Sequence, residues 1–400
     1  MVGAGHAGGS VAAFLRQLGH RGEIVLLGEE PLPPYQRPPL SKALLKGQAS
    51  AADLLLRSEG FYAEQNITLR RSVRVERLTR SAKAVTLQGG ETVPYDILIL
   101  ATGARARKLP VPGMGLLGVL ALRSVADAEA LRAQLGPEKH LAVIGGGYVG
   151  LEAAASARSL GATVTVIERE PRILARVACE TLSCFFQDQH RSHGVSFELN
   201  ASVEALEGAD GQVTGVRLAG GRLLPCDVAL IGVGAVPNDE LAREAGLDCT
   251  DGVVVDLTAR TADPAVYAIG DVTHRPMPLY DRMFRLESVP NALEQAKQAA
   301  ADICGKPAPA PETPWFWSDQ YDLKLQIAGV PFNADRAVVR GDPAGAKFAV
   351  FHLLGQRLLA VEAVNAAPEF LMGKMLIAAG KPLSLERLAN PAVSMKEVAA

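Results

Sequence analysis

Little in this 400-residue sequence suits a membrane, a nucleic acid or an oxidising compartment. Its 41 Lys+Arg nearly balance its 43 Asp+Glu, which disfavours a nucleic-acid binder of basic overall charge. Its apolar runs, such as VALIGVGAV, are shorter than the ~18 residues of a membrane helix, and its glycine-broken start is unlike a secretory signal. Five cysteines scattered over this length do not make a disulfide framework. We therefore expect a cytoplasmic protein that binds neither nucleic acid nor membrane.

Glycine, by contrast, is abundant, with 39 residues, and one glycine cluster has a recognisable spacing. Gly145, Gly147 and Gly150 follow the apolar segment 141–144 and precede a small-residue helix and a strand that ends at Glu168. A strand bent tightly into a helix faces backbone N–H groups toward a pyrophosphate, and an acid ~20 residues later can bind a ribose hydroxyl. Residues 141–168 therefore predict a complete β-α-β dinucleotide-binding unit.

The N-terminus repeats this pattern with one part missing. Gly3, Gly5 and Gly8 have the same spacing, followed by a helix-like run and a strand that ends at Glu29. Only Met1 and Val2 precede Gly3. We expect a second dinucleotide unit whose first strand is cut short because the chain begins a few residues late.

Two further apolar segments complete the expected sheets. Residues 95–104 contain Ala101, Thr102 and Gly103 at their end, and residues 265–272 end in Gly270 and Asp271. Ligands of open α/β sheets lie beyond the carboxyl ends of strands, although Gly-Asp alone is also an ordinary turn signal. The sequence thus predicts an α/β fold with two Rossmann-like domains.

This combination resembles the two-dinucleotide, glutathione-reductase-like flavoprotein reductases, which implies FAD at the first loop and a nicotinamide coenzyme at the second. The disulfide reductases of that superfamily carry C-x4-C after the second FAD strand, but PPYQRPPLSK (33–42) has no cysteine there. Cys179 and Cys184 have this spacing, but they follow the nicotinamide unit by about ten residues and so lie in the wrong domain for that role; we expect ordinary thiols that take no part in turnover. The histidines show no metal-ligand spacing, so no metal site is expected.

PPYQRPPLSK, ESVPNALEQAKQAA and PWFWSDQY resemble the oxygenase-coupled ferredoxin reductases. The resemblance implies that Lys42 lies beside the flavin ring, where its charge would stabilise the reduced ring. Ser41 after two prolines could instead begin a helix and leave Lys42 in solvent. Trp317 would lie between flavin and partner, unless it packs in a core. The other residues implied to bind FAD are Gly3, Gly5, His6, Ala7, Gly8, Glu29, Arg37, Ala101, Thr102, Gly103, Arg105, Arg123, Asp271, Ser288, Val289 and Pro290.

The same resemblance implies an NADH site in the second unit. Glu152 would pair with Lys42 and accept from the nicotinamide carboxamide, unless it is a surface helix acid, and Tyr148, in the loop, would gate the flavin face. Glu168 would favour NADH over NADPH, although the adjacent Arg169 could accommodate a 2′-phosphate. Lys42, Glu152 and Tyr148 are the expected catalytic residues. The other residues implied to bind NAD are Gly145, Gly147, Val149, Gly150, Glu168, Arg169, Arg176, Gly232 and Gly234.

We expect an FAD-binding domain of residues 1–106 and 232–312, an NAD-binding domain of 107–231, and a C-terminal α/β domain of 313–400 behind the linker 305–314. The expected activity is transfer of electrons from NADH through FAD to a small acidic [2Fe–2S] ferredoxin of a monooxygenase or dioxygenase, by a monomeric enzyme. Alternatives are a reductase of a quinone or dehydroascorbate, and an NADH-responsive flavoprotein related to apoptosis-inducing factor. Arg275, Arg282 and Arg285 are either a ferredoxin-docking face or ordinary solvated charges.

Overall fold

A computed structural model describes residues 1–399 as two compact units, each assembled from three stretches of chain. The first unit contains residues 1–36, 54–105 and 236–316, and the second contains 37–53, 106–235 and 317–400. Residues 37–53, which the sequence analysis assigned to the FAD-binding domain, thus belong to the second unit. No helix in the described residues is long and apolar enough to cross a membrane.

The first unit is built on a parallel sheet whose centre is the start of the chain. β1 (Ile24–Leu27) pairs with β2 (Ile67–Arg70), and β6 (Leu98–Leu100) pairs with β19 (Val266–Ala268). Val2 bridges Leu27 and Leu100 in parallel, so residues 1–3 occupy the place expected for a central first strand. The order is therefore β2, β1, Val2, β6, β19.

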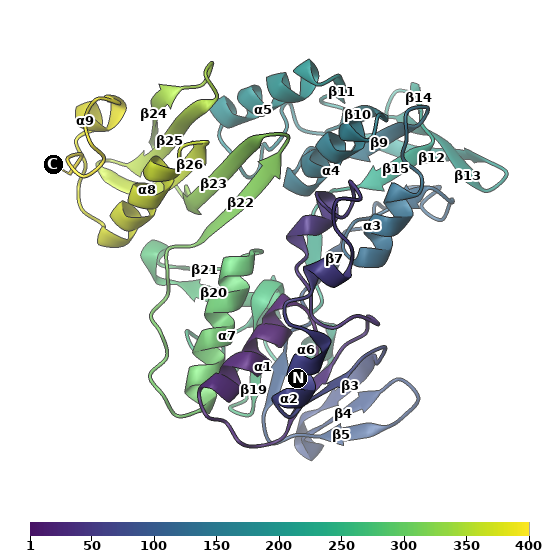
Figure 1. Cartoon of the computed structure of the whole chain (residues 1–400), viewed down its shortest axis with the longest axis vertical. Coiled ribbons are helices and arrows are strands. Elements are labelled where there is room, and N and C mark those ends of the chain that lie inside the picture. Colours follow the sequence, from purple (N-terminus) through teal and green to yellow (C-terminus); the bar gives the residue numbers. More distant parts are fainter. Residues whose placement is uncertain (400) are drawn as a thin grey trace. The chain divides into compact units, whose positions relative to one another are not determined.

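Helices α1 (His6–Gln17) and α7 (Val289–Ile303) lie side by side in this unit (Figure 1). Their apolar residues pack with those of the sheet in one core that includes Val11, Leu26, Ile99, Tyr267 and Ala296. A second core contains Val2, Leu27 and Leu98 together with apolar residues of the shorter strands, such as Leu78, Val85 and Val253. The remaining elements are α2 (Glu59–Glu64), β3 (Val75–Thr79), β4 (Ala84–Leu87), β5 (Thr92–Pro94), α6 (Glu240–Glu244), β17 (Cys249–Thr250), β18 (Gly252–Val254), β20 (Thr273–Met277) and β21 (Arg282–Phe284).

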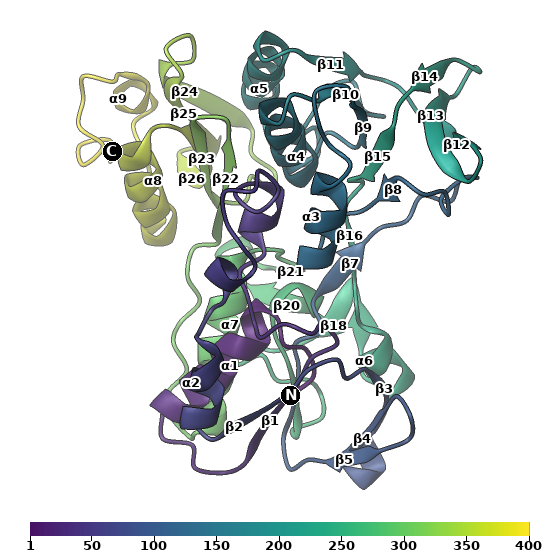
Figure 2. The ribbon, with the colours of Figure 1, turned by 45° about the vertical axis from the view of Figure 1, so that its right-hand side comes forward.

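The second unit repeats this parallel architecture. Its sheet has the order β11 (Val195–Glu198), β10 (Thr163–Ile167), β9 (His140–Ile144), β15 (Val228–Ile231) and β8 (Val119–Leu120). The glycine helix α4 (Tyr148–Ser159) follows β9, as α1 follows Val2. Figure 2 shows the antiparallel strands β12 (Val203–Ala209), β13 (Gln212–Leu218) and β14 (Leu223–Pro225) at the side of this sheet. Helices α3 (Val125–Arg132) and α5 (Glu180–Ser192) also belong to this unit. The short paired strands β7 (Ala104–Ala106) and β16 (Ala235–Pro237) have most of their residues in the first unit.

The C-terminal residues form an antiparallel sheet with helices at its end. The strand order is β22 (Trp315–Gln320), β23 (Leu323–Gly329), β26 (Arg357–Val364), β25 (Lys347–Leu354) and β24 (Arg336–Asp342). Helices α8 (Ala367–Ala379) and α9 (Leu385–Ala389) follow. The strands read as nearly continuous apolar runs because β25 and β26 are buried on both faces.

Candidate functional site

Three glycines at the junction of β9 and α4 have different structural roles. Gly145 has φ +109, and a Cβ there would lie 2.4 Å from the carbonyl oxygen of Gly232. A Cβ on Gly150 would lie 2.4 Å from the carbonyl oxygen of Gly145, so both positions are closed to any side chain by packing. A Cβ on Gly147 would meet nothing within 4 Å, so packing does not require this glycine. Its backbone faces open space, which a pyrophosphate can approach closely.

The two glycine helices differ from the other long helices at their N-termini. α1 begins after Gly5 and α4 after Gly147; within the described residues neither has a side-chain cap or an acid in its first turn. By contrast, Ser124 caps α3 and Ser288 caps α7, while α5 and α8, which also lack a side-chain cap in the described part of the chain, carry the acids Glu180 and Glu369 in their first turns. Uncapped N–H groups at the positive end of a helix bind phosphate, so both loops fit the pyrophosphate of a dinucleotide.

The glycine helices begin earlier than the sequence indicated. Tyr148 is the first residue of α4, not a loop residue, because the helix starts directly after Gly147. Its hydroxyl donates to the carbonyl of Val177 over 3.1 Å. Burial, with smaller contributions from Glu362 and Cys179, holds the pKa of Tyr148 well above its usual range, so the phenol stays protonated.

Glu168 is fixed at the end of β10 by backbone donors. Its Oε2 accepts from the N–H of Gly146 over 2.7 Å, and its Oε1 accepts from the N–H of Glu170 over 2.9 Å. Arg169 beside it has a side chain that is 72% exposed and pairs with Glu170. Near the ends of the neighbouring strands, Gly234 has φ +100, and the Arg176 guanidinium lies 3.7 Å from the position of its Cβ. Val149 is also exposed.

Lys42 and Glu152 form the predicted ion pair in the second unit. Lys42 follows a 3-10 turn (Pro38–Ser41), and its Nζ lies 2.8 Å from Glu152 Oε2. Glu152 is 5% exposed, so it is not a surface acid, and Lys42 is not a solvated helix residue. Ser41 donates to Glu152 Oε2 over 2.5 Å, and Ser318 donates to Oε1 over 2.7 Å.

The two serines were missed by sequence reasoning. Ser318 lies 166 positions from Glu152, and no local spacing connects them. Ser41 was considered only as a helix cap. Burial of a carboxylate requires several donors. The available signal was that Glu152 stands among small and apolar residues of α4, which indicated that donors from elsewhere in the chain must bind it.

In the first unit, the glycine loop and the end of β6 are packed against each other. Gly3 has φ +108, and a Cβ there would lie 2.1 Å from the carbonyl oxygen of Ala101. A Cβ on Gly8 would lie 2.0 Å from the carbonyl oxygen of Gly3. The chain then turns through Gly103 at φ +64. The first turn of α1 carries His6 and Ala7, so the loop brings the first predicted FAD residues together.

A residue that the sequence analysis missed, Asn238, holds the end of this turn. Thr102 Oγ1 donates to the Asn238 carbonyl over 2.7 Å, and Asn238 Nδ2 returns a bond to the Thr102 carbonyl over 2.8 Å. Arg105 donates to Asn238 Oδ1 over 2.8 Å and pairs with Glu240 over 2.6 Å. Glu29, at the position equivalent to Glu168, is exposed and pairs with Arg74.

Asp271 lies in a 3-10 turn (Gly270–Val272) directly after β19. The buried Gln295 fixes this turn, because its Oε1 accepts from the N–H of Gly270 over 2.8 Å and from Thr273 Oγ1 over 3.0 Å. Ser288 accepts from the N–H of Asn291 over 3.2 Å and thereby starts α7, with Val289 and Pro290 as its first residues.

Four residues expected to bind FAD lie in the second unit, whereas the FAD loop lies in the first. They are Arg37, Lys42, Arg123 and Trp317. Arg37 donates to the carbonyl of Arg123, whose own N–H donates to Asp127 Oδ2 over 3.0 Å. Trp317 is half-buried on β22.

The prediction that Arg275 belongs to a partner-docking cluster of arginines, or is an ordinary solvated charge, is wrong. Arg275 is 2% exposed and donates to Asn291 over 2.8 Å and to Glu294 over 2.7 Å. The reason is that α7 carries two oxygen acceptors to the inward face of β20. The Arg285 side chain is 11% exposed and is paired with Asp251 and Glu287. Arg282 is the member of the cluster that is exposed.

Known proteins share this architecture over the full length of the chain. Residues 1–296 match the family described as pyridine nucleotide-disulphide oxidoreductase, and residues 315–399 match the reductase C-terminal family. A probable ferredoxin reductase of Castellaniella defragrans is 53% identical over 400 residues, covering 100% of this chain and 98% of the relative. The anthranilate 1,2-dioxygenase system ferredoxin–NAD(+) reductase component of Burkholderia cepacia is 42% identical over 99% of this chain and 98% of its own. Among solved structures, the covalent putidaredoxin reductase–putidaredoxin complex matches with a TM-score of 0.97 and 42% identity, over 99% of this chain and 96% of that one.

Proposed function

The chain belongs to the pyridine nucleotide-disulphide oxidoreductase family, and from this premise we propose that it passes electrons from NADH through FAD to a small acidic [2Fe–2S] ferredoxin that supplies a monooxygenase or dioxygenase. It is an oxidoreductase of the ferredoxin-reductase type, with the predicted fold of two Rossmann-like units and a C-terminal domain. The observation that carries the proposal is the pair of uncapped glycine helices, one in each unit of a single chain. Two such helices serve two different dinucleotides.

The first unit would hold FAD. The N–H groups at the start of α1 would bind its pyrophosphate, and Thr102 and Asp271 lie at the ends of neighbouring strands β6 and β19. FAD, when bound, supplies the chemistry that connects a two-electron donor to a one-electron acceptor. We assign FAD binding to residues 1–106 and 232–312, NAD binding to 107–231 and the separate C-terminal domain to 313–400.

The second unit would bind and orient NADH. The N–H groups at the start of α4 would hold the pyrophosphate, and Glu168 would accept from the adenosine ribose hydroxyls. The carboxylate of Glu168 is already oriented by two backbone donors, so little ordering entropy remains to be lost on binding.

Lys42 and Glu152 would provide preorganised charge. Ser41 and Ser318 hold the Glu152 carboxylate in place, and the carboxylate in turn holds the Lys42 ammonium. A fixed ammonium stabilises developing negative charge without reorganisation during the reaction. Glu152 would also accept a hydrogen bond from the nicotinamide carboxamide. Tyr148, as a protonated phenol, would gate the nicotinamide position.

The proposed partner is an acidic ferredoxin, and the proposed working form is a monomer in the cytoplasm. All five cysteines are free thiols, which supports a reducing compartment.

The test is steady-state turnover with NADH and a panel of acceptors comprising [2Fe–2S] ferredoxins, a quinone, dehydroascorbate and ferricyanide. We expect kcat/KM to be highest for a ferredoxin. A higher value for the quinone or dehydroascorbate would make the protein a small-molecule reductase. If NADH reduced the bound flavin once but no acceptor supported continued turnover, the protein would be a non-enzymatic flavoprotein.

The same assay tests the ion pair. Glu152→Gln removes the charge that positions Lys42, so we expect the rate of flavin reduction by NADH to fall about tenfold or more, with unchanged flavin content. Glu129→Gln, an exposed acid of α3, serves as the matched control. Equal rates for the two variants would remove Glu152 from the mechanism.

A further inference from the structure

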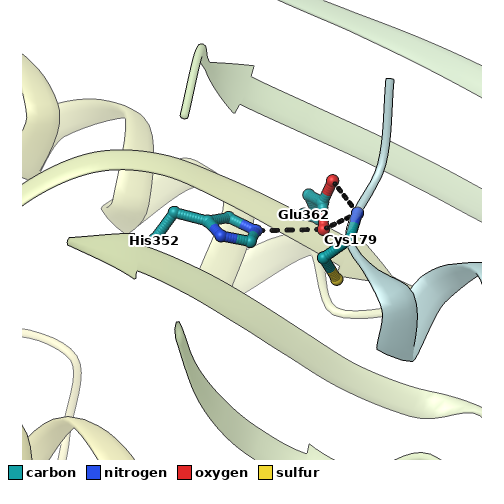
Figure 3. Close-up of side chains that lie close together, drawn as sticks. All are labelled: Cys179, His352 and Glu362. Atoms are coloured by element: carbon teal, nitrogen blue, oxygen red, sulfur yellow. Dashed lines mark hydrogen bonds and ion pairs between the residues drawn. The ribbon is translucent and has the colours of Figure 1, made fainter. Parts of the chain in front are cut away.

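Three potential metal ligands meet in the second unit, at a place to which the proposed reaction assigns no role. Cys179 is the residue that precedes α5, His352 lies on β25, and Glu362 lies on β26. One ligand atom of each lies within 4.8 Å of those of the other two. Figure 3 shows the Glu362 carboxylate between the imidazole of His352 and the backbone of Cys179.

The strand register explains how two of these side chains come together. β25 and β26 are antiparallel neighbours in which His352 faces Ala360 and Val350 faces Glu362. His352 and Glu362 are therefore a diagonal pair on one face of the sheet, a separation that long side chains bridge. A register irregularity begins after His352, as is common where a strand re-aims a side chain.

The two strand residues of the cluster are more deeply buried than the cysteine. Glu362 is 1% exposed and His352 is 6% exposed, and their Oε2 and Nε2 atoms are 3.0 Å apart. The N–H of Cys179 donates to the Glu362 carboxylate over 3.1 and 3.3 Å. Cys179 itself is half-buried.

We propose that Cys179, His352 and Glu362 bind a divalent cation of the Zn²⁺ type. A thiolate, an imidazole and a carboxylate are the three ligand classes that Zn²⁺ combines in tetrahedral sites. A water molecule would take the fourth position. Binding replaces the thiol proton of Cys179, which is released to solvent. His352 keeps its proton by carrying it on Nδ1, which leaves Nε2 free to bind the metal. Sites with softer cations such as Cd²⁺ follow the same chemistry.

The arrangement has a physical rationale that is independent of coenzyme binding. A buried carboxylate held by a histidine and a backbone N–H keeps a large desolvation cost, which a bound dication would offset. The start of α5 adds a partial positive charge that works against a cation, and the Glu362 carboxylate at that end of the helix offsets it.

The metal would join two distant parts of the sequence. Cys179 belongs to the coenzyme-binding stretch and Glu362 to the C-terminal sheet, 183 positions apart. A ligand that binds the folded chain and not the unfolded one raises stability by mass action. The site would therefore act as a metal-dependent fastening of the C-terminal sheet to the segment that begins α5.

The test uses the flavin-loaded protein and Zn²⁺ alone. Equilibrium dialysis at micromolar free Zn²⁺, followed by metal analysis, should give one Zn²⁺ per wild-type chain. Cys179→Ser should lower the affinity at least tenfold, and it should fold normally because serine is a preferred residue at the start of a helix. Cys184→Ser, which changes the exposed cysteine of the same helix, is the matched control and should bind Zn²⁺ as the wild type does.

Two further readouts keep the result independent of activity. Zn²⁺ should raise the Tm of the wild type and the Cys184→Ser variant by a few degrees, and not that of Cys179→Ser. Co²⁺ in place of Zn²⁺ should give a thiolate charge-transfer band in the difference spectrum that Glu362→Gln weakens and Cys179→Ser abolishes. Equal Zn²⁺ binding by Cys179→Ser and the wild type, or no binding by the wild type, would overturn the proposal.

Discussion

At the level of single residues, the two nucleotide units differ most in the acid that follows the second strand. Glu168 has both carboxylate oxygens bound to backbone N–H groups, while Glu29 is an exposed acid paired with Arg74. The fixed carboxylate can discriminate between a ribose hydroxyl and a 2′-phosphate, because with the phosphate it loses a hydrogen bond and gains a charge repulsion. The neighbouring Arg169 is turned to solvent and Glu170.

We therefore expect Glu168 to determine the preference for NADH. Glu168→Gln should lower kcat/KM for NADH and raise it for NADPH, so that their ratio falls about tenfold or more. The measurement is steady-state kinetics with both coenzymes and ferricyanide as acceptor, with Glu129→Gln, an exposed acid of α3, as control. A wild-type preference for NADPH would mean that Arg169 dominates.

His190 gives a separate prediction about pH. It is fully buried on α5, with its Nε2 2.8 Å from Gln320 Oε1 and its Nδ1 3.0 Å from the hydroxyl of Tyr321. Burial lowers the pKa of His190 from 6.5 to about 4. The unfolded chain thus binds a proton at higher pH than the folded chain does, so this contribution to stability is complete above about pH 6.5 and is lost as the pH falls toward 4.

The free energy of unfolding should fall by about 2 kcal/mol between pH 7 and pH 5 from this residue alone. His190→Gln keeps a polar partner for Gln320 and removes the titration, so the variant should lose less stability over that range. Urea unfolding at the two pH values measures the difference, with His20→Gln as control. An identical pH dependence in His190→Gln and the wild type would show that the folded protein protonates His190 at its ordinary pKa.

At the level of elements, two glycines before α4 serve different purposes: Gly145 is needed for packing, and Gly147 leaves space for a ligand. Gly145 is required by its positive φ and by the carbonyl of Gly232, whereas Gly147 has ordinary backbone angles and open space at its Cβ. The two positions are two residues apart, which makes them a matched pair.

Gly147→Ala should leave Tm nearly unchanged and raise the KM for NADH about tenfold, because its methyl group would occupy space that the pyrophosphate needs. Gly145→Ala should lower Tm by several degrees or prevent folding, because both its backbone and its neighbours forbid a side chain. Thermal unfolding and NADH titration of the two variants test the distinction. An unchanged KM in Gly147→Ala would mean that the dinucleotide does not pass this glycine.

The same elements show what sequence reasoning can reach. The order of glycines, helix and acid predicted both nucleotide units because these are local consequences of one turn geometry. The start of α4 was placed too late, because the sequence does not show that the helix begins directly after Gly147 and therefore includes Tyr148. Ser318 and Asn238 were not predicted, because their roles depend on contacts with residues more than 130 positions away.

At the scale of the whole molecule, repetition was predictable and burial of charge was not. In both units the strand before the glycine helix is central, with the next two strands along the chain on one side and a later strand on the other. Arg275 could not be separated from Arg282 by sequence, since both stand in one charged segment. The packing of α7 distinguishes them. Asn291 and Glu294 of this helix bind Arg275, whereas Arg282 lies on exposed β21.

This burial sharpens the prediction for the electron acceptor. Of the three arginines, Arg282 is exposed on β21 and can meet an acidic ferredoxin, whereas the side chains of Arg275 and Arg285 are 3% and 11% exposed. Attraction between exposed charges acts over about 10 Å at 0.1 M salt. Arg282→Glu should therefore raise the KM for a [2Fe–2S] ferredoxin several-fold at low salt, and the difference from wild type should shrink as salt is added.

The control variant is Arg77→Glu, which reverses an exposed charge on β3 and should leave the KM for ferredoxin unchanged. Ferricyanide reduction should be unaffected in both variants, because a small acceptor needs no docking face. If Arg282→Glu lowered both activities together, the arginine would support the fold or the flavin. If it lowered neither, the ferredoxin would dock on a surface that does not include β21. Only a selective, salt-sensitive rise in KM fits an electrostatic encounter at β21, since charge reversal there leaves the FAD loop and the coenzyme-binding glycines untouched.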